Sequence, residues 1–408
     1  MSYICSDTDT ITAIATPSGN GGVGIIRISG DSASTIASKI INKELSPRYA
    51  TLVKLSIPNI TDTAIAIYFP NPNSFTGEDV VELQMHGGTL LIQTVLDHVI
   101  SLGARLANPG EFTKRALLNG KITLLAAENI SNLIHAESDM ELLTAGSMSS
   151  GELHEKIVSI EKQLVNISAQ LEAALDHPEE VEIPSLESQI KSFIAILSQY
   201  TDNAKQSNYI YDGINVAILG EPNAGKSSLF NALLGSSRSI VTDIAGTTTD
   251  IVSETLQIGG YKIRLVDTAG IRNNPRDQIE QMGIDRTRLA AQNCDFAIIF
   301  DNTALALIQN KPHIKVTRST TVEQIKSEIL KLVPSNNSKH IANRRQLNEL
   351  CQSQIALTSA LESAKNGDTA DLIASDIATA LFHISNITGT NAGEAVLDEI
   401  FSRFCLGK

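Results

Sequence analysis

The sequence predicts a fold of α/β plus all-α class. An N-terminal α+β domain is followed by a helical domain in two segments, with an α/β domain inserted between them. Three observations support this. Short β-branched runs separated by turn residues fill the first part of the chain. Apolar residues then recur at helical spacing in two separate stretches. Between these stretches, an apolar run leads into a glycine-rich loop and a helix.

The changes of pattern set the expected domain limits. Residues 1–121 form the α+β domain, residues 122–212 and 333–408 the two helical segments, and residues 213–332 the α/β domain. A length of 408 residues is enough for two or three separate cores. The formal charge is −13, from 32 basic and 45 acidic residues. A chain this acidic is unsuited to bind nucleic acid through a broad basic surface of its own.

The cysteines and the apolar runs predict a cytoplasmic protein. Cys5, Cys294, Cys351 and Cys405 lie far apart and form no C-x-x-C pair, which argues against disulfides and a zinc site. The first residues have neither the basic nor the apolar part of a signal peptide. No apolar run reaches the ~18 residues that span a bilayer, so we expect no membrane association.

Turn residues divide the N-terminal domain. Residues 19–24 match G-x-G-x-x-G, but residues 25–29 continue as a strand where a dinucleotide site needs a helix. A hairpin-like turn is therefore predicted there. The turn-rich segments 73–79 and 108–113 are each followed by helix-like sequence, so a helix is expected after both.

Apolar stripes predict the core of a helix bundle. The first long helix carries Ile157, Ile160, Leu164, Ile167, Leu171 and Leu175, and the second carries Leu186, Ile190, Phe193, Ile194 and Leu197. The C-terminal segment continues the pattern with Leu347, Leu350, Ile355, Leu357, Leu361 and Leu372, and with residues 377–381.

Residues 214–228 have the strand–loop–helix order of a phosphate-binding loop. An apolar run ends in Gly220-x4-Gly225-Lys226-Ser227, and SLFNALLG follows as a helix. Such glycines let backbone N–H groups surround phosphates at a helix N-terminus. Lys226 is expected to reach the β- and γ-phosphates and Ser227 to bind Mg²⁺. The pattern predicts binding of a nucleoside triphosphate.

Two further segments complete a GTPase pattern. Residues 251–258 and 261–266 read as antiparallel strands ending in Asp267-Thr268-Ala269-Gly270, where Asp267 would orient Mg²⁺ and the Gly270 amide would sense the γ-phosphate. Residues 242–250 are a candidate first switch. More strands are expected at 296–300 and 313–316. The order and spacing of the phosphate-binding loop, residues 242–250 and Asp267-Thr268-Ala269-Gly270 indicate a GTPase of the translation-factor-like class.

The residues that would orient the hydrolytic water and recognise the guanine base depart from this GTPase pattern. Ile271 stands where many GTPases place a water-orienting glutamine. Guanine is normally read by N-K-x-D after a strand, but Asn310-Lys311 lacks the aspartate and precedes strand 313–316. We interpret that pair as a coincidence. The expected positions hold Thr317-Arg318-Ser319-Thr320 instead.

Several motifs resemble the MnmE (TrmE) family of tRNA-modification GTPases over nearly the whole chain. They are the loop with Asn223, TDIAGTT, DTAG, VGIIRISG, NSFTGEDVVELQMHGG, PGEFTKRALLNGK and the terminal FCLGK. The resemblance implies a folate-binding N-terminal domain that forms a homodimer, a discontinuous helical domain and an inserted P-loop G domain. It also implies a heterotetramer with an FAD-dependent MnmG-type partner, which meets tRNA and adds an aminomethyl-type group to C5 of the wobble uridine. A tetrahydrofolate derivative would supply the one-carbon unit.

The resemblance also implies roles for individual residues. Folate would contact Arg27, Glu82, Lys121 and Lys408. Mg²⁺ would be bound by Ser227 and Thr248, and K⁺ by Asn223, Thr242, Ile244 and Thr247. Glu280 would orient the hydrolytic water. The GTP-binding residues would be Asn223, Ala224, Gly225, Lys226, Ser227, Ser228, Thr242, Asp243, Ile244, Ala245, Gly246, Thr247, Thr248, Asp267, Thr268, Ala269 and Gly270.

The sequence departs from the family between Phe300 and Leu332, which is too short for the usual strands and helices. Two alternatives therefore stay open. One is a non-hydrolysing scaffold that keeps folate and partner binding. The other is a ribosome-assembly GTPase, which the acidic charge and the terminal motif disfavour. Cys405 is interpreted either as a buried structural thiol or as a catalytic one.

Overall fold

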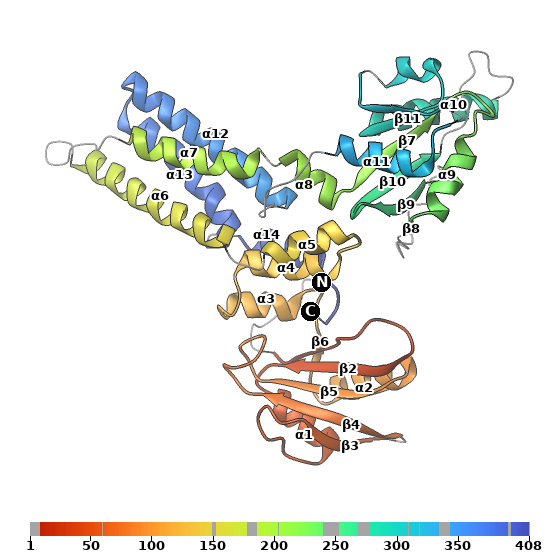
Figure 1. Ribbon diagram of the computed structural model, residues 1–408. Helices are drawn as coiled ribbons and strands as arrows, with labels where there is room; N and C mark the ends of the chain where they lie inside the picture. The colour runs from red at the N-terminus through yellow and green to blue at the C-terminus, as the bar shows by residue number, and fades with distance from the viewer. Residues whose placement is uncertain are drawn as a thin grey trace. The chain divides into compact units, whose positions relative to one another are not determined.

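The computed structural model describes residues 9–58, 60–148, 152–177, 186–202, 204–239, 253–267, 278–308, 310–317, 319–333, 343–390 and 393–407. The chain divides into two compact units (Figure 1). The first comprises residues 1–131 and 385–408, and the second residues 132–384. Each is taken by itself below.

A six-stranded sheet forms the body of the first unit, in the order β3-β4-β5-β2-β1-β6. Its strands are β1 (Ile11–Ile14), β2 (Gly21–Ser29), β3 (Thr51–Ile57), β4 (Ile60–Phe69), β5 (Val80–Gly87) and β6 (Arg105–Leu106). One face packs on two helices, α1 (Ala33–Ile41) and α2 (Thr89–Ser101). Ile26, Ile28 and Leu83 are buried in that core, whereas the residues between them along each strand face the other way.

Two predictions for this unit are confirmed and one is wrong. β1 and β2 pair as an antiparallel hairpin, although Gly21, Gly22 and Gly24 of the predicted turn lie in β2, and α3 (Glu111–Leu118) begins within the second turn-rich segment. Residues after 79, however, form strand β5 and not a helix. β5 lies between β4 and β2, and Val81, Leu83 and Met85 alternate onto the covered face. That period of two outweighs the local helical preference.

The opposite face of this sheet exposes apolar side chains. Leu52 of β3 and Ile65 of β4 are directly opposite each other, and they are 71% and 41% exposed. The unit is completed by α3, α14 (Glu394–Ser402) and most of α4 (Leu124–Ile134), which bury Leu124, Leu397 and Phe401.

One part of the second unit consists of helices alone. They are α5 (Asp139–Met148), α6 (Glu152–Asp176), α7 (Glu187–Thr201), α8 (Ala204–Tyr211), α12 (Arg344–Asn366) and most of α13 (Ala370–Thr388). The predicted stripes of α6 and α7 are buried, except that Leu175 is exposed and Ile194 is half-buried. On α12 and α13, Ile355 and Leu372 are exposed. Ile355 is 62% exposed because it lies five residues from Leu350, which turns it about 140° from the stripe.

A second six-stranded sheet forms the rest of this unit, in the order β12-β11-β7-β10-β9-β8. The elements are β7 (Ile214–Leu219), α9 (Lys226–Gly235), β8 (Arg238–Ser239), β9 (Ser253–Ile258), β10 (Tyr261–Asp267), α10 (Gln278–Asn293), β11 (Phe296–Ile299), the 3₁₀ helix η1 (Asn302–Leu307), β12 (His313–Lys315) and α11 (Val322–Leu332). β7 is paired in parallel with β10 and β11, and β9 with β10 is the predicted antiparallel pair. The predicted strands at 296–300 and 313–316 are confirmed as β11 and β12.

The β12 edge of this sheet is short. β12 has 3 residues, and the described chain between β11 and β12 contains only η1 as a helix. Lys311 lies in the turn before β12, where its Nζ donates to the carbonyl oxygen of Gln292 and, at 2.7 Å, to that of Cys294. Lys311 therefore holds the end of α10, which supports the interpretation of Asn310-Lys311 as a coincidence.

Candidate functional site

The loop between β7 and α9 has the backbone of a phosphate-binding loop. Gly220, Asn223 and Gly225 have φ values of 159°, 64° and 99°. Left-handed backbone is most accessible to glycine and then to asparagine, so the residue types fit the turn. A Cβ at Gly220 would lie 2.9 Å from the Cβ of Phe300, which excludes larger residues there. Gly225 caps α9, whose first N–H groups have no partner within the helix. This geometry favours an anion.

Lys226 lies over this loop. It is 6% exposed, and its Nζ donates to the carbonyl oxygens of Gly220 at 3.1 Å and Glu221 at 2.9 Å. An ammonium held there by carbonyl oxygens is placed to meet phosphate oxygens bound by the same loop.

Asp301, two residues after β11 and at the N-cap of η1, holds the loop from the neighbouring segment. Its Oδ2 accepts the backbone N–H of Glu221 at 2.7 Å, and its Oδ1 accepts that of Thr303 at 3.0 Å. Burial raises the pKa of this carboxyl, but hydrogen bonds from Thr303 and from the Glu221 N–H outweigh burial, so the pKa of Asp301 is lowered. The carboxylate is therefore charged at neutral pH.

The fold brings the two predicted halves of the nucleotide site together. Asp267, the last residue of β10, pairs with Ile218 of β7, immediately before the loop. Asn223, Ala224, Gly225, Lys226, Ser227 and Ser228 occupy the loop and the first turn of α9. Outside the described residues lie Thr242, Asp243, Ile244, Ala245, Gly246, Thr247, Thr248, Thr268, Ala269, Gly270 and Lys408, and the side chains of Asp267 and Glu280.

A second cluster lies in the first unit, on the sheet face away from α1 and α2. Arg27 of β2 and Glu82 of β5 are directly opposite each other. The Nε and Nη2 atoms of Arg27 donate to Glu82 Oε1 at 3.0 and 2.8 Å, and Nη1 donates to the carbonyl oxygen of Gly407 at 3.3 Å. The guanidinium carbon lies 5.7 Å from the ring centres of both Phe75 and Phe112.

The structure thus joins two of the residues implied in folate binding, Arg27 and Glu82, to the chain end next to Lys408. Lys121 is exposed. It contacts the loop that carries Phe75, because a Cβ at Gly77 would lie 3.0 Å from Lys121 Cε.

A network of charges supports α3 beside this cluster. Arg105 donates to Asp9 at 2.7 Å and to Glu111 at 2.7 Å, and Arg115 bonds Asp9, Glu111 and Glu78. Hydrogen bonding from Arg105 is the main cause that lowers the pKa of Asp9. Burial raises the pKa of Glu111, but Arg105, the Asn108 N–H and Arg115 together lower it. Both carboxylates are therefore held ionised.

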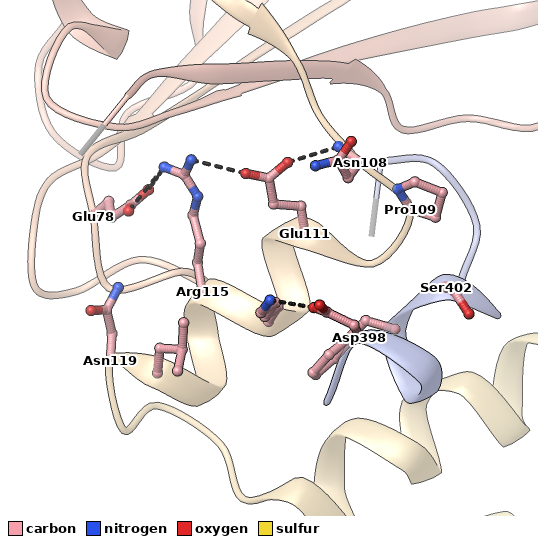
Figure 2. Close-up of a pocket in the computed structure, with 11 residues that line it drawn as sticks. Glu78, Asn108, Pro109, Glu111, Arg115, Asn119, Asp398 and Ser402 are labelled. Atoms are coloured by element: carbon pink, nitrogen blue, oxygen red, sulfur yellow. Dashed lines mark hydrogen bonds and ion pairs between the residues drawn. The ribbon is translucent and has the colours of Figure 1, made fainter. Parts of the chain in front are cut away.

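A cavity of about 630 Å³ lies against the same helix (Figure 2). Figure 2 shows Glu111 and Arg115 of α3 bonded to each other on one side and Asp398 of α14 on another. Its lining residues are Glu78, Asn108, Pro109, Glu111, Lys114, Arg115, Leu118, Asn119, Asp398, Phe401 and Ser402.

Sequence reasoning missed Phe75, Phe112 and Asp301. Asp301 could have been found as the polar residue that follows a predicted strand beside the loop. The two phenylalanines had no comparable signal, because only the fold brings them to Arg27. Cys405 is exposed, so its interpretation as a buried structural thiol is wrong.

A glycine-rich loop between a parallel strand and a helix, with D-T-A-G at the end of the adjacent strand, defines a P-loop GTPase class protein. Residues 10–121 match the family described as "GTP-binding protein TrmE N-terminus", and residues 124–405 match the "MnmE helical domain". The chain belongs to the MnmE family of tRNA modification GTPases.

Two curated relatives agree with this assignment. The chain is 38% identical over 456 positions to "tRNA modification GTPase MnmE" of Coxiella burnetii, covering 100% of both chains. It is 35% identical to the Francisella philomiragia protein of the same name, covering 98% of this chain and 99% of that one. A solved structure, the G domain of the T. maritima FeoB iron transporter, is 24% identical over 29% of this chain and 98% of that chain, with a TM-score of 0.22.

The alignment with the Coxiella burnetii relative has 456 positions for the 408 residues here. At least 48 positions of that alignment therefore have no counterpart in this chain, since 456 − 408 = 48.

Within the residues that the structure describes, no helix is long and apolar enough to cross a membrane.

Proposed function

We propose that this chain is a K⁺-dependent GTPase of the pathway that places an aminomethyl-type group on C5 of the tRNA wobble uridine. It hydrolyses GTP with Mg²⁺ and takes a one-carbon unit from a tetrahydrofolate derivative. It acts in the cytoplasm as a homodimer, in a heterotetramer with an FAD-dependent MnmG-type partner that brings the tRNA. The exposed pair Leu52 and Ile65 supports the dimer, because paired apolar side chains on an open sheet face favour a second sheet.

The observation that carries the proposal is the cluster around Arg27. A pterin is flat and has N–H groups along one edge, and folate ends in carboxylates. Glu82 supplies an acceptor for such N–H groups, while the half-buried Phe75 supplies a ring face and the fully buried Phe112 supports Arg27 from below. Arg27 and Lys408 supply positive charge for the carboxylates.

The phosphate loop supports the GTPase part. Ser227 is in the first turn of α9, where its hydroxyl can bind Mg²⁺, and the Asn223 amide supplies an oxygen of the kind K⁺ binds. These residues fit both ions. A bound K⁺ supplies positive charge beside the phosphates. Lys226 neutralises phosphate charge, the loop amides orient the phosphates, and Glu280 orients the water.

A scaffold without turnover is the second candidate, favoured by the short β12 edge. Thr317 Oγ1, which follows β12, lies 3.1 Å from Ser319 Oγ and 2.9 Å from Thr320 Oγ1. These hydroxyls bond one another in place of a base-reading motif.

Folate binding tests the proposal most directly. Calorimetric titration with 5-formyltetrahydrofolate should show at least a tenfold loss of affinity in Arg27→Met, roughly the value of one charge-assisted hydrogen bond. Removal of Lys408 should also weaken binding. Lys39→Met, at an exposed position of α1 on the other side of the sheet, is the matched control and should bind like the parent. Equal affinity in Arg27→Met and the parent contradicts the folate assignment. Folate binding without GTP hydrolysis favours the scaffold.

A further inference from the structure

The turn between β9 and β10 is enclosed by two helices. Gly260 accepts the backbone N–H of Met140, at the start of α5, at 2.9 Å. A Cβ at Gly260 would lie 3.3 Å from Met140 Cγ, and one at Gly259 would lie 2.5 Å from Leu330 of α11. Gly259 has a φ of 56° and Gly260 a φ of 86°, both of which are positive. The hairpin therefore packs directly on α5, and its turn has no room for larger residues.

Lys262, the second residue of β10, joins this hairpin to α5 by charge. Its Nζ lies 2.8 Å from Glu141 Oε1 and 3.1 Å from Glu137 Oε2, and its side chain is 13% exposed. Gly213 makes room for the lysine, because a Cβ there would lie 3.2 Å from Lys262 Cε. Burial lowers the pKa of Lys262, but the carboxylates of Glu141 and Glu137 outweigh burial, so its pKa is raised. The ammonium is charged.

Glu141 also caps the helix that Lys262 contacts. Its Oε2 accepts the N–H of Ser138 at 3.2 Å, and Ser138 Oγ accepts the N–H of Glu141 at 3.3 Å. This reciprocal pair is a capping box, which fixes the first turn of α5. The two oxygens of one carboxylate thus bind the start of α5 and the start of β10.

The other end of β10 is at the nucleotide site. Asp267 ends the strand beside the phosphate loop, five residues and about 16 Å from Lys262 at ~3.3 Å per residue. β10 is hydrogen-bonded to β7 on one edge and β9 on the other. β10 is therefore one continuous paired strand from Lys262 to Asp267, and it is the physical connection between the two sites.

We propose that Lys262 and Glu141 are positioning residues that link the strand bearing Asp267 to the N-terminus of α5, so that triphosphate binding changes the stability of α5. The inference rests on the proposed binding of GTP. A merely structural ion pair stabilises α5 equally with and without nucleotide, whereas a linked pair does not.

Hydrogen exchange of the α5 amides, with and without a non-hydrolysable GTP analogue, tests the linkage. In the parent chain the analogue should change α5 exchange by about fivefold or more, the lower end of ordinary coupling. Lys262→Met should bind the analogue and lose that change, whereas Lys262→Arg should keep it. Lys326→Met is the matched control, since Lys326 pairs with Glu323 at 3.0 Å elsewhere in the same unit. It should behave like the parent.

The double variant Glu137→Gln/Glu141→Gln is the second test, because it removes both carboxylates that face Lys262, while a glutamine at position 141 of the capping box still accepts from Ser138. It should lose the response as Lys262→Met does, even if the latter folds poorly. An unchanged response in this double variant, or analogue binding without any response in the parent, overturns the linkage alone. Absence of analogue binding by the parent overturns the proposed GTPase function as well.

Discussion

The Oδ2 atom of Asp301 accepts the backbone N–H of Glu221 at 2.7 Å, which ties the end of β11 to the phosphate loop. The loop is therefore held by a neighbouring strand as well as by its own glycines. Because the carboxylate is charged, this hydrogen bond belongs to the stronger class. Its loss should loosen the loop at the residue next to Gly220.

Asp301→Ala should weaken GTP binding about tenfold to hundredfold, the range expected for a charge-assisted hydrogen bond that orders a site. Calorimetric titration measures the loss. Thr303→Val is the control, because it removes a hydroxyl that bonds Asp301 and leaves the Asp301–Glu221 bond intact. An affinity in Asp301→Ala within about twofold of the parent would show that the loop holds its shape unaided.

Asn223 should determine the ion dependence of hydrolysis. Its φ of 64° means that Asn223→Ala would add backbone strain to the loss of the amide. Asn223→Gly removes the amide at a conformation that glycine adopts freely. We expect the parent to hydrolyse GTP in K⁺ and not in Na⁺, and Asn223→Gly to lose this difference. Steady-state rates in the two salts decide it, and equal parent rates contradict the K⁺ site.

Loss of the N-K-x-D aspartate should reduce guanine selectivity. Two charge-assisted bonds to the base are missing, which corresponds to about 10²–10⁴-fold in affinity. Glu323, a possible substitute reader, instead pairs with Lys326 at 3.0 Å. Titrations should therefore place GTP, ITP and ATP within about tenfold of one another. Micromolar GTP binding with no detectable ATP binding would refute this and imply another reader.

The charge network of α3 should make the first unit acid-sensitive. The pKa values of Asp9 and Glu111 are lowered in the fold, so their contribution to stability is present above the unfolded values near 4 and is lost as pH falls. Glu111→Gln should lower the melting temperature at pH 7 because Arg105 and Arg115 lose a buried partner.

The same variant should lose less stability than the parent on acidification, because one linked carboxylate is absent. Thermal unfolding from about pH 7 to pH 3 measures both effects. Glu187→Gln is the control, because Glu187 pairs with Lys191 on the exposed surface of α7. This variant should have the same pH profile of stability as the parent. Parallel profiles for Glu111→Gln and the parent would contradict the network's role.

Features that depend only on neighbouring residues could be predicted from the sequence. The phosphate loop was predictable because glycines and a lysine at fixed spacing impose the turn whatever surrounds it. The stripes of α6 and α7 followed from the helical period, since side chains three and four residues apart share a face. The antiparallel pairing of β1 and β2 followed because strand sequence continues after the glycines of residues 19–24, although the turn itself lies at residues 15–20.

Contacts between residues far apart in the chain could not be predicted in this way. Residues 80–87 look helical in isolation, yet they form β5 because two strands flank them. Arg27 and Glu82 are 55 residues apart and touch because β2 and β5 pair in one register. Lys262 meets Glu141 only because the β9–β10 turn packs on α5. Such contacts depend on packing between elements, which no local pattern of residue types encodes.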